Sequence, residues 1–404
     1  MDRRLLVLAL GMFALGTDSF VVAGVLPEIA RSFDVSIGAA GQMTTLYSIT
    51  YAVLAPVIAT FAAHIPRKRL LLVGLAVFVV ANLGTAFAPS FGFALATRAL
   101  AGFGAAVYSP TATGSAPMIV APDRRGFAIA VVLTGLTIST ALGSPAGTII
   151  AGLGNWHWTM MFVAALAALA GLGVMAFLSH IPMLPPVSFA KRLKPLTDAR
   201  VSLTLLSSLL FFSGVFIVYT YFAVVFDRAI DGNSMLLGAM LVMWGLAGVV
   251  SNLLAGRLSD RIGSRAVLVT MLAVVTANFI FLKWTSASLW TAIPAVVVWG
   301  TFGWGVLVPQ QHRLVTIAPA AAPILLGLNN SATFFGATAG SLLGAARIPM
   351  FGGHALGYAG AVLVAASLIG SEFAARKILA ANRQSASGES PATLHTDSPK
   401  QVKV

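Results

Sequence analysis

Residues 4–27 form an apolar run at the start of the chain, RLLVLALGMFALGTDSFVVAGVLP. The hydrocarbon core of a bilayer is about 30 Å thick and is crossed by about 20 helical residues. The run is long enough for this, and no cleavable signal peptide stands out around it. We expect it to be retained as a first membrane-spanning helix that carries one acidic residue, Asp18.

The same composition continues through most of the 404 residues, of which 58% are hydrophobic and 9% are charged. A soluble globular protein carries about 25% charged residues, so a soluble fold is excluded. The chain is predicted to be an all-α polytopic membrane protein with twelve transmembrane helices. The expected spans are residues 4–27, 38–63, 69–88, 91–118, 126–151, 157–179, 201–226, 233–256, 264–283, 289–309, 323–346 and 355–375.

The basic residues are distributed unevenly between the two sides of such a bundle. Twenty of the 25 Lys and Arg residues lie on the side of the termini, whereas only Arg31, Arg228, Lys283 and Arg347 lie on the other side, and Arg98 lies within a span. Because positively charged loops stay in the cytoplasm, both termini are expected there, in a bacterial-type inner membrane. This pattern explains the net charge of +13 without a nucleic-acid partner.

A basic, proline-rich connection divides the chain near its middle. Residues 180–200 contain four prolines and four Lys or Arg residues. We predict a first six-helix bundle over residues 1–179, a cytoplasmic linker over 180–200 and a second six-helix bundle over 201–378. Residues 379–404 are rich in Ser, Pro and Thr and are predicted to form a disordered cytoplasmic tail.

Three glycines in the fifth predicted helix of the first half recur at the same spacing in the fifth predicted helix of the second half. Three matches at one offset indicate a parallel repeat of two bundles. In transporters of this build, the substrate site lies near the midplane between the halves. The matched glycines are Gly126, Gly135 and Gly143 in the first half and Gly327, Gly336 and Gly344 in the second, each pair 201 residues apart.

Several short motifs are typical of one transporter family. Residues 256–265 read GRLSDRIGSR, residues 98–104 read RALAGFG, residues 143–147 read GSPAG, and Asp18 follows Gly-Thr in the first helix. With these motifs the chain resembles the major facilitator superfamily over about residues 1–378. Within it, the chain is similar to the twelve-span drug:proton antiporters, especially arabinose-efflux-like and chloramphenicol-resistance-like exporters. The resemblance implies two pseudo-symmetric six-helix bundles and proton-coupled export.

Asp18 is predicted to carry a proton. An ionisable group within a span costs roughly 2.5–3.5 kcal/mol on insertion scales and is therefore a candidate functional group. A carboxyl group whose solvation changes can bind and release a proton. The alternative is that Asp18 holds a local hydrogen-bond network or a permanent pair with Arg98. Arg98 either controls the proton site, as the resemblance implies, or extends to the outer interface.

The fifth helix is a candidate for conformational change. Gly135, Gly143 and Gly147 let backbones approach closely, and Pro145 removes one helical hydrogen bond. The alternative is ordinary helix packing. The resemblance associates this motif with antiport.

A second gating candidate lies at the cytoplasmic end of the eighth helix. Asp260 is expected to pair with an arginine or a helix N-terminus and to release it as the halves move. The alternative is a solvated turn. The first-half copy of this loop has Ala63 and Pro66 in place of the acid and the glycine of the family motif, so a gating role falls to Asp260 or is absent. The residues of the second-half motif that we single out are Gly256, Arg257, Asp260, Arg261, Gly263 and Arg265.

Polar and aromatic residues at mid-depth are candidates to line a substrate cavity. An apolar pocket with a few hydrogen-bonding groups suits neutral or amphiphilic solutes. Each of these residues has the alternative of an ordinary helix contact. The candidates are Gln42, Tyr47, Tyr51, Asn82, Tyr108, Tyr219, Tyr221, Trp244, Asn252, Trp299, Asn329 and Asn330.

The predicted function is proton-coupled export, by alternating access, of a small organic solute such as a drug, a sugar or a nucleoside. A facilitator or a proton-coupled importer would share the fold and is the alternative. A membrane enzyme is less expected because no cluster of catalytic or metal-binding residues stands out, and a channel would need rings of charge or carbonyl groups. No cysteine is present, and no metal or cofactor is expected. A monomer in the lipid bilayer suffices for this design.

Overall fold

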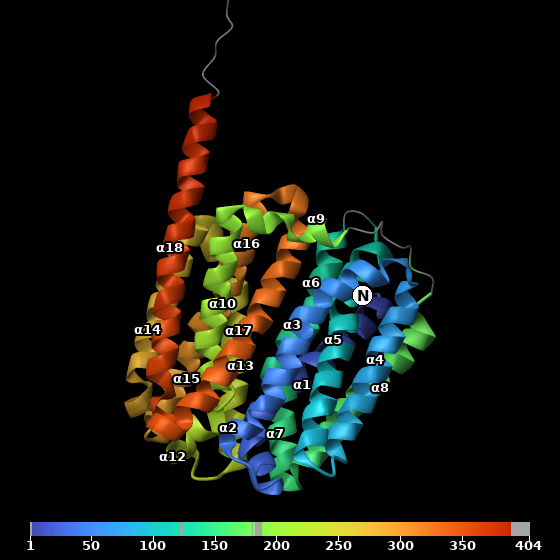
Figure 1. Ribbon diagram of the computed structural model, residues 1–404, viewed down its shortest axis with the longest axis vertical. Helices are drawn as coiled ribbons and strands as arrows, with labels where there is room; N and C mark the ends of the chain where they lie inside the picture. The colour runs from blue at the N-terminus through green and yellow to red at the C-terminus, as the bar shows by residue number, and fades with distance from the viewer. Residues whose placement is uncertain (1, 122–123, 180, 182–187, 389–404) are drawn as a thin grey trace, which may run out of the picture.

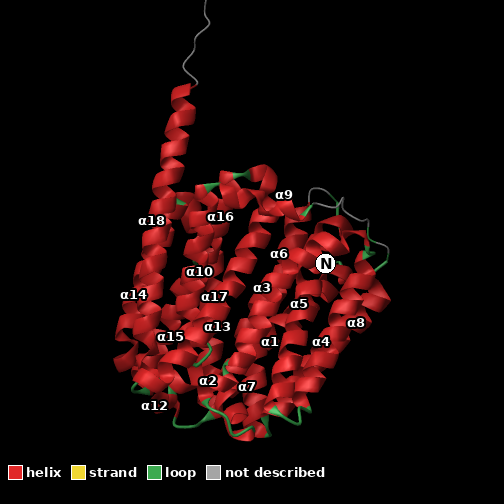
Figure 2. Ribbon diagram, viewed as in Figure 1, coloured by secondary structure: helices red, strands yellow, loops and turns green. Residues whose placement is uncertain are grey.

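The computed structural model describes residues 2–121, 124–179, 181 and 188–388, and every regular element in these ranges is a helix (Figure 2). The helices run side by side as one elongated bundle (Figure 1). The first six spans are α1 (Arg3–Ser32), α2 with α3 (Ile37–Ala40, Gln42–Phe61), α4 (Arg67–Ala86), α5 (Phe91–Ile119), α6 with α7 (Arg125–Ile138, Ser144–Leu153) and α8 (Trp156–Phe177).

The last six spans follow two short helices of the linker, α9 (Phe189–Leu193) and the 3-10 helix η4 (Lys194–Thr197). Short helices α11 (Phe222–Val225) and α12 (Asp227–Ile230) connect the first two of these spans. The spans are α10 (Ala199–Tyr219), α13 (Ser234–Ile262), α14 (Ser264–Thr285), α15 with α16 (Leu289–Trp304, Leu307–Ile317), α17 (Ala322–Phe351) and α18 (Leu356–Gly388).

The span count agrees with a multi-pass membrane protein. Within the described ranges, eleven of these helices or helix pairs are long and apolar enough to cross a membrane. Helix α17 is outside that set, and Asn329 and Asn330 lower its hydropathy. It is nevertheless 30 residues long and packs along α10 and α3, as a further span does. The predicted all-helical, multi-pass fold is confirmed.

Both ends of the described chain lie on one face of the bundle, which we call the terminal face. Figure 1 shows the N-terminus, the linker helix α9 and the C-terminal end of α18 on this face, and α2 and α12 on the opposite face. Helix α18 continues to Gly388, so residues 379–388 are helical, and the prediction of disorder is wrong there. Residues 389–404 of the predicted tail, and residues 180 and 182–187 of the predicted linker, lie outside the described residues.

The glycine repeat has a structural basis. A Cβ atom on Gly135 would lie 2.0 Å from the carbonyl oxygen of Ala9 in α1, and one on Gly336 would lie 2.6 Å from that of Leu209 in α10. In each half, therefore, the fifth span touches the backbone of the first span through a glycine. The other two pairs also match. A Cβ on Gly143 would meet the side chain of Thr17 in α1, and one on Gly344 would meet that of Tyr221, just after α10. No atom lies within 4 Å of a Cβ added to Gly126 or Gly327.

The two groups of six spans meet along α3–α17 and along α7–α13. Bare glycine backbone makes part of this contact, since a Cβ on Gly245 of α13 would lie 2.4 Å from the Thr140 oxygen. Three side-chain hydrogen bonds between described residues join the groups. They run from Tyr219 to the oxygen of Phe20, from Asn330 to Tyr51 and from Ser341 to the oxygen of Gly41.

Candidate functional site

A buried ion pair lies inside the first group of spans. Nη1 of Arg98 in α5 donates to Oδ1 of Asp18 in α1 at 2.6 Å, and the two side chains are 1% and 0% exposed. Asp18 Oδ2 and Arg98 Nε have no hydrogen-bond partner among the described residues. Burial of an ion pair is costly unless its remaining polar atoms also form hydrogen bonds, and these two atoms are free to form further ones. Arg98 does not extend to the membrane surface.

The backbone around Gly102 positions the arginine. Gly102 lies one helical turn after Arg98, and a Cβ there would lie 2.4 Å from the carbonyl oxygen of Tyr47. The missing side chain thus lets α5 approach α3, and the Arg98 guanidinium lies over the Tyr47 ring, 4.9 Å from its centroid. Such a contact stabilises the cation. Ser19, next to Asp18, donates to the Tyr47 hydroxyl at 3.0 Å.

The second group of spans repeats this helix contact but lacks the charges. A Cβ on Gly300 in α15 would lie 2.4 Å from the carbonyl oxygen of Trp244 in α13, as in the Gly102–Tyr47 contact. Here Trp244 packs against the ring of Tyr219, with centroids 4.6 Å apart, and against Trp299 at 5.5 Å. Equivalent contacts therefore support an ion pair in one half and an aromatic cluster in the other.

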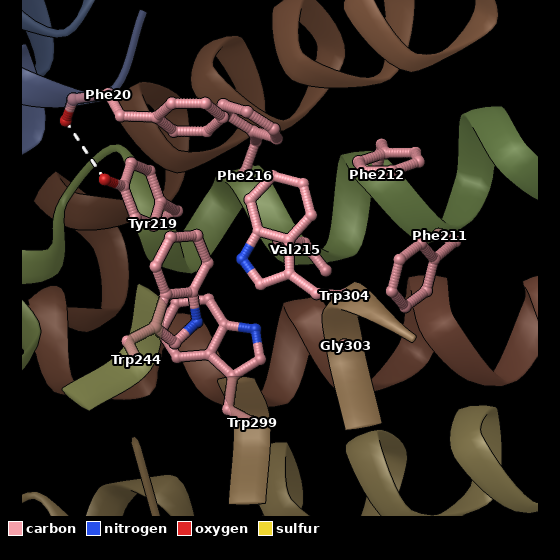
Figure 3. A pocket seen from close by; sticks show the side chains of 10 residues that line it. All are labelled: Phe20, Phe211, Phe212, Val215, Phe216, Tyr219, Trp244, Trp299, Gly303 and Trp304. Atoms are coloured by element: carbon pink, nitrogen blue, oxygen red, sulfur yellow. Dashed lines mark hydrogen bonds between the residues drawn. The ribbon is translucent and has the colours of Figure 1, made fainter. Parts of the chain in front are cut away.

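This cluster forms an aromatic pocket, shown in Figure 3. Phe20 of α1 closes one side, and the Tyr219 hydroxyl donates to its carbonyl oxygen at 3.0 Å. Tyr219, Trp244 and Trp299 were predicted from the sequence, whereas the other residues that line the pocket were not. The spacing of Phe212, Phe216 and Tyr219 on one helical face was the signal available. The pocket is lined by Phe20, Phe211, Phe212, Val215, Phe216, Tyr219, Trp244, Trp299, Gly303 and Trp304.

Tyr51 connects the two groups of spans at mid-depth. Its hydroxyl donates to Ser109 at 3.1 Å and accepts from Nδ2 of Asn330 at 3.0 Å, and its ring packs on Phe334 at 4.0 Å. The neighbouring Asn329 points away, into α10, where Ser208 donates to it at 2.7 Å.

The other cavity candidates lie in helix contacts. The Tyr108 hydroxyl donates to the oxygen of Leu8 at 3.0 Å. The Tyr221 hydroxyl donates to that of Ser341 at 2.9 Å. Gln42 bonds back to its own segment at Gly38. The Asn82 side chain likewise donates to the backbone oxygen of Phe78 in its own helix. The side-chain oxygen of half-buried Asn252 has no hydrogen-bond partner among the described residues.

The fifth span follows α1 on both sides of Asp18. A Cβ on Gly143 would lie 1.9 Å from Thr17 Oγ1, and one on Gly147 would lie 2.4 Å from Val21. The segment Ser139–Gly143 is π-helical, a local widening that is frequent at functional sites, and Pro145 lies in the first turn of α7. The predicted close packing of this helix is observed, and it lies next to the ion pair.

The loop motif lies on the terminal face. Gly263, at φ +85°, ends α13 in a conformation that side chains rarely adopt. Arg257, Asp260 and Arg261 are exposed, and Gly256 is half-buried. Asp260 forms no ion pair with another residue of the described chain, so the expected pair is not formed in this conformation.

Arg265 of the same motif makes a contact that was not predicted. It pairs with Glu372 of α18, with Nε 3.1 Å from Oε1. In the first half, Lys68 at the start of α4 instead donates to the oxygens of Met175 and Leu178 at the end of α8. A basic residue at the start of the third span therefore contacts the last span in both halves.

Several known proteins are similar to this chain in sequence. The family model of the Major Facilitator Superfamily matches residues 8–341. The chloramphenicol resistance protein of Streptomyces lividans is 28% identical over 91% of this chain and 95% of its own length. The inner membrane transport protein YdhP of Escherichia coli K12 is 29% identical (92% and 96%), and a probable sugar efflux transporter of Helicobacter pylori is 26% identical (89% and 92%).

A solved structure has the same fold. It is a bacterial homologue of the human lysosomal transporter Spinster, in an inward-facing and occupied conformation, with a TM-score of 0.76 at 16% identity over 93% of this chain and 97% of that one. The chain therefore belongs to the Major Facilitator Superfamily and is a multi-pass membrane transporter of small solutes, not an enzyme.

Proposed function

We propose that this transporter exports a small organic solute from the cytoplasm in exchange for protons, and that Asp18 carries the proton. The observation that carries the proposal is the buried Asp18–Arg98 pair, whose second carboxylate oxygen has no partner among the described residues. Export is also supported by the names of two relatives, a chloramphenicol resistance protein and a probable sugar efflux transporter.

Protonation changes the balance of this pair. A proton that binds Asp18 leaves a neutral carboxyl group and removes the counter-charge of Arg98. An unpaired buried guanidinium is costly, so the protein is driven to a conformation in which Arg98 gains a new partner or water. Release of the proton restores the pair. The proton thus biases an equilibrium between two states, as coupled transport requires.

The contacts between the halves support alternating access. The three side-chain hydrogen bonds between them lie at mid-depth or toward the opposite face, at Phe20, Tyr51 and Gly41. We infer that these bonds hold the opposite face closed in this conformation. The outward-open state then requires these three bonds to break while the halves rock about the glycine-lined contact of α7 with α13.

Charge orients this cycle in the membrane. The excess of Lys and Arg on the terminal face supports a cytoplasmic location of both termini. We propose that residues 1–179 and 201–378 move as the two units and that 180–200 connects them. A single chain contains both units, so a monomer suffices.

The test measures proton movement in everted membrane vesicles whose interior is acidified by respiration. Drugs, sugars and nucleosides are added in turn, and a transported solute lowers the pH gradient as protons leave. Asp18→Asn abolishes this signal. Asp34→Asn is the matched control, because Asp34 is exposed at the opposite face with φ +50°, which asparagine tolerates equally well. A full signal from Asp18→Asn excludes Asp18 as the proton carrier. Solute movement without any proton signal favours a facilitator.

A further inference from the structure

The aromatic pocket contains hydrogen-bond donors without acceptors. The indole Nε1 atoms of Trp244, Trp299 and Trp304 have no partner among the described residues. Trp244 and Trp299 are 3% and 1% exposed, so neither nitrogen is compensated by bulk solvent. Figure 3 shows the three nitrogens facing the space between the rings. A buried N–H without an acceptor is unfavourable, and its recurrence three times in one pocket indicates a site for an external acceptor.

The residues that line the pocket indicate which chemical groups a ligand must carry. The indole N–H is only a donor, and the Tyr219 hydroxyl already donates to Phe20. The other lining residues are Phe, Val and Gly, so no charged side chain faces the pocket. A sugar would leave most of its hydroxyl donors without acceptors. A flat, neutral ring with oxygen acceptors satisfies both the ring faces and the indole donors.

Trp304 is more exposed than the other two tryptophans of the pocket. As described, the space between the rings holds only about one water-sized molecule. Trp304 is half-buried and stands between Gly303 and Gly305, where α15 ends before α16 begins. A Cβ on Gly248 would lie 2.3 Å from the Trp304 ring, so a glycine makes room for this ring as well. Binding of a larger ring therefore requires Trp304 to move at this break in the span.

We propose that this pocket binds the ring of a neutral aromatic solute, and that the N–H groups of Trp244, Trp299 and Trp304 donate to its oxygen acceptors. This names the substrate class of the transporter and rests on the proposed function. The binding step itself requires neither a proton gradient nor an ionised Asp18.

Binding to the purified full-length protein tests the pocket. The probe is methyl 4-nitrobenzoate, a flat neutral ring with oxygen acceptors and no donor, and tryptophan fluorescence quenching reports its binding. Trp299→Phe and Trp304→Phe keep an aromatic ring but remove one donor each, and each raises the Kd several-fold, up to about tenfold. Trp290→Phe is the control, because Trp290 is 85% exposed and lies outside the pocket. Benzyltrimethylammonium, a cation without an acceptor, binds more weakly and is insensitive to these substitutions.

Several results overturn the proposal. One is a Kd for methyl 4-nitrobenzoate that is unchanged in both pocket variants, or that rises equally in Trp290→Phe. Tighter binding of benzyltrimethylammonium would make the pocket a cation site instead. Thermal unfolding of each variant identifies a folding defect, and the more exposed Trp304 supplies the second variant if Trp299→Phe does not fold. The Asp18→Asn protein still binds the probe, and its Kd still rises when Trp299→Phe or Trp304→Phe is added, so a failure of proton coupling is distinguishable from a failure of the pocket.

Discussion

Asp18 and Phe20 lie two residues apart on α1, yet their side chains contact opposite groups of spans. Asp18 pairs with Arg98 of α5, whereas the Phe20 ring packs edge-on against Tyr219 and Trp304, with centroids 5.5 and 5.6 Å apart. Two residues along a helix differ by about 200° in direction, which explains the two faces. A shift of α1 that breaks the ion pair therefore also moves one wall of the aromatic pocket. This is the proposed physical link between proton and solute.

Replacing Phe20 should weaken solute binding and leave the proton site intact. Phe20→Leu keeps an apolar side chain but removes the ring that contacts Tyr219 and Trp304. We expect the KM for solute-driven proton release to rise about five- to tenfold, the equivalent of about 1–1.5 kcal/mol of ring contact, with little change in the maximal rate. Initial rates in everted vesicles measure both values. A lowered maximal rate at unchanged KM contradicts this role.

The two charges of the buried pair should depend on each other. Arg98→Gln alone leaves a buried carboxylate unpaired and is expected to cost about 3–5 kcal/mol. Adding Asp18→Asn to Arg98→Gln removes both charges and should recover most of that loss without restoring proton exchange. Thermal unfolding of the purified single and double variants measures this coupling. If the losses of stability simply add in the double variant, the two charges do not stabilise each other, and the proposed ion pair is contradicted.

The glycines beside the two sites should be intolerant of a methyl group. Gly102→Ala and Gly300→Ala each place a Cβ about 2.4 Å from a backbone oxygen, so the helices must separate. We expect each to lower stability by about 1–3 kcal/mol, with Gly102→Ala displacing Arg98 and Gly300→Ala displacing Trp244. Gly171→Ala is the control, because no atom lies within 4 Å of its added Cβ. Equal unfolding temperatures for all three variants would contradict the close helix contact.

Asp198 should stabilise the start of α10 in a pH-dependent manner. Its side chain caps the helix through the Arg200 N–H, and the hydrogen bond from the Arg200 side chain holds the pKa of Asp198 below its ordinary value of 3.8. A carboxyl group with a lowered pKa stabilises the fold above its unfolded pKa and loses that effect as the pH falls through the folded pKa. Asp198→Ala should therefore cost about 0.5–2 kcal/mol at pH 7 and progressively less as the pH falls below 3.8. Unfolding temperatures over a series of pH values measure this, and a cost that does not decrease as the pH falls contradicts it.

Much of the architecture was predictable because membrane spans are encoded locally. Runs of apolar residues and the glycine offset of 201 required no knowledge of tertiary contacts. The structure explains this offset, because Gly135 and Gly336 contact the backbones of the equivalent helices α1 and α10. Disorder was predicted for residues 379–388 because their composition is polar. They are helical because they continue α18, whose apolar part precedes them.

The sites were predictable only in part. Asp18 and Arg98 stood out because charge within a span is rare, but their direct contact depends on how α1 and α5 rotate against each other. The aromatic pocket combines α1, α10, α13 and α15, and Trp304 gave no sign in the sequence of facing inward. Asp260 was expected to pair, yet Arg265 makes the ion pair, because Arg265 lies at the start of α14, which packs against α18, whereas Asp260 is exposed at the end of α13.

The central claim is that Asp18 exchanges its proton for solute, and proteoliposomes test it most directly. The solute identified in vesicles is supplied outside, the interior is made acidic, and its accumulation is measured beside the internal pH. Wild type and Asp34→Asn should accumulate solute against its gradient while the interior becomes less acidic. Asp18→Asn should only equilibrate the solute, without a change in internal pH. Accumulation by Asp18→Asn at the wild-type level would contradict the account.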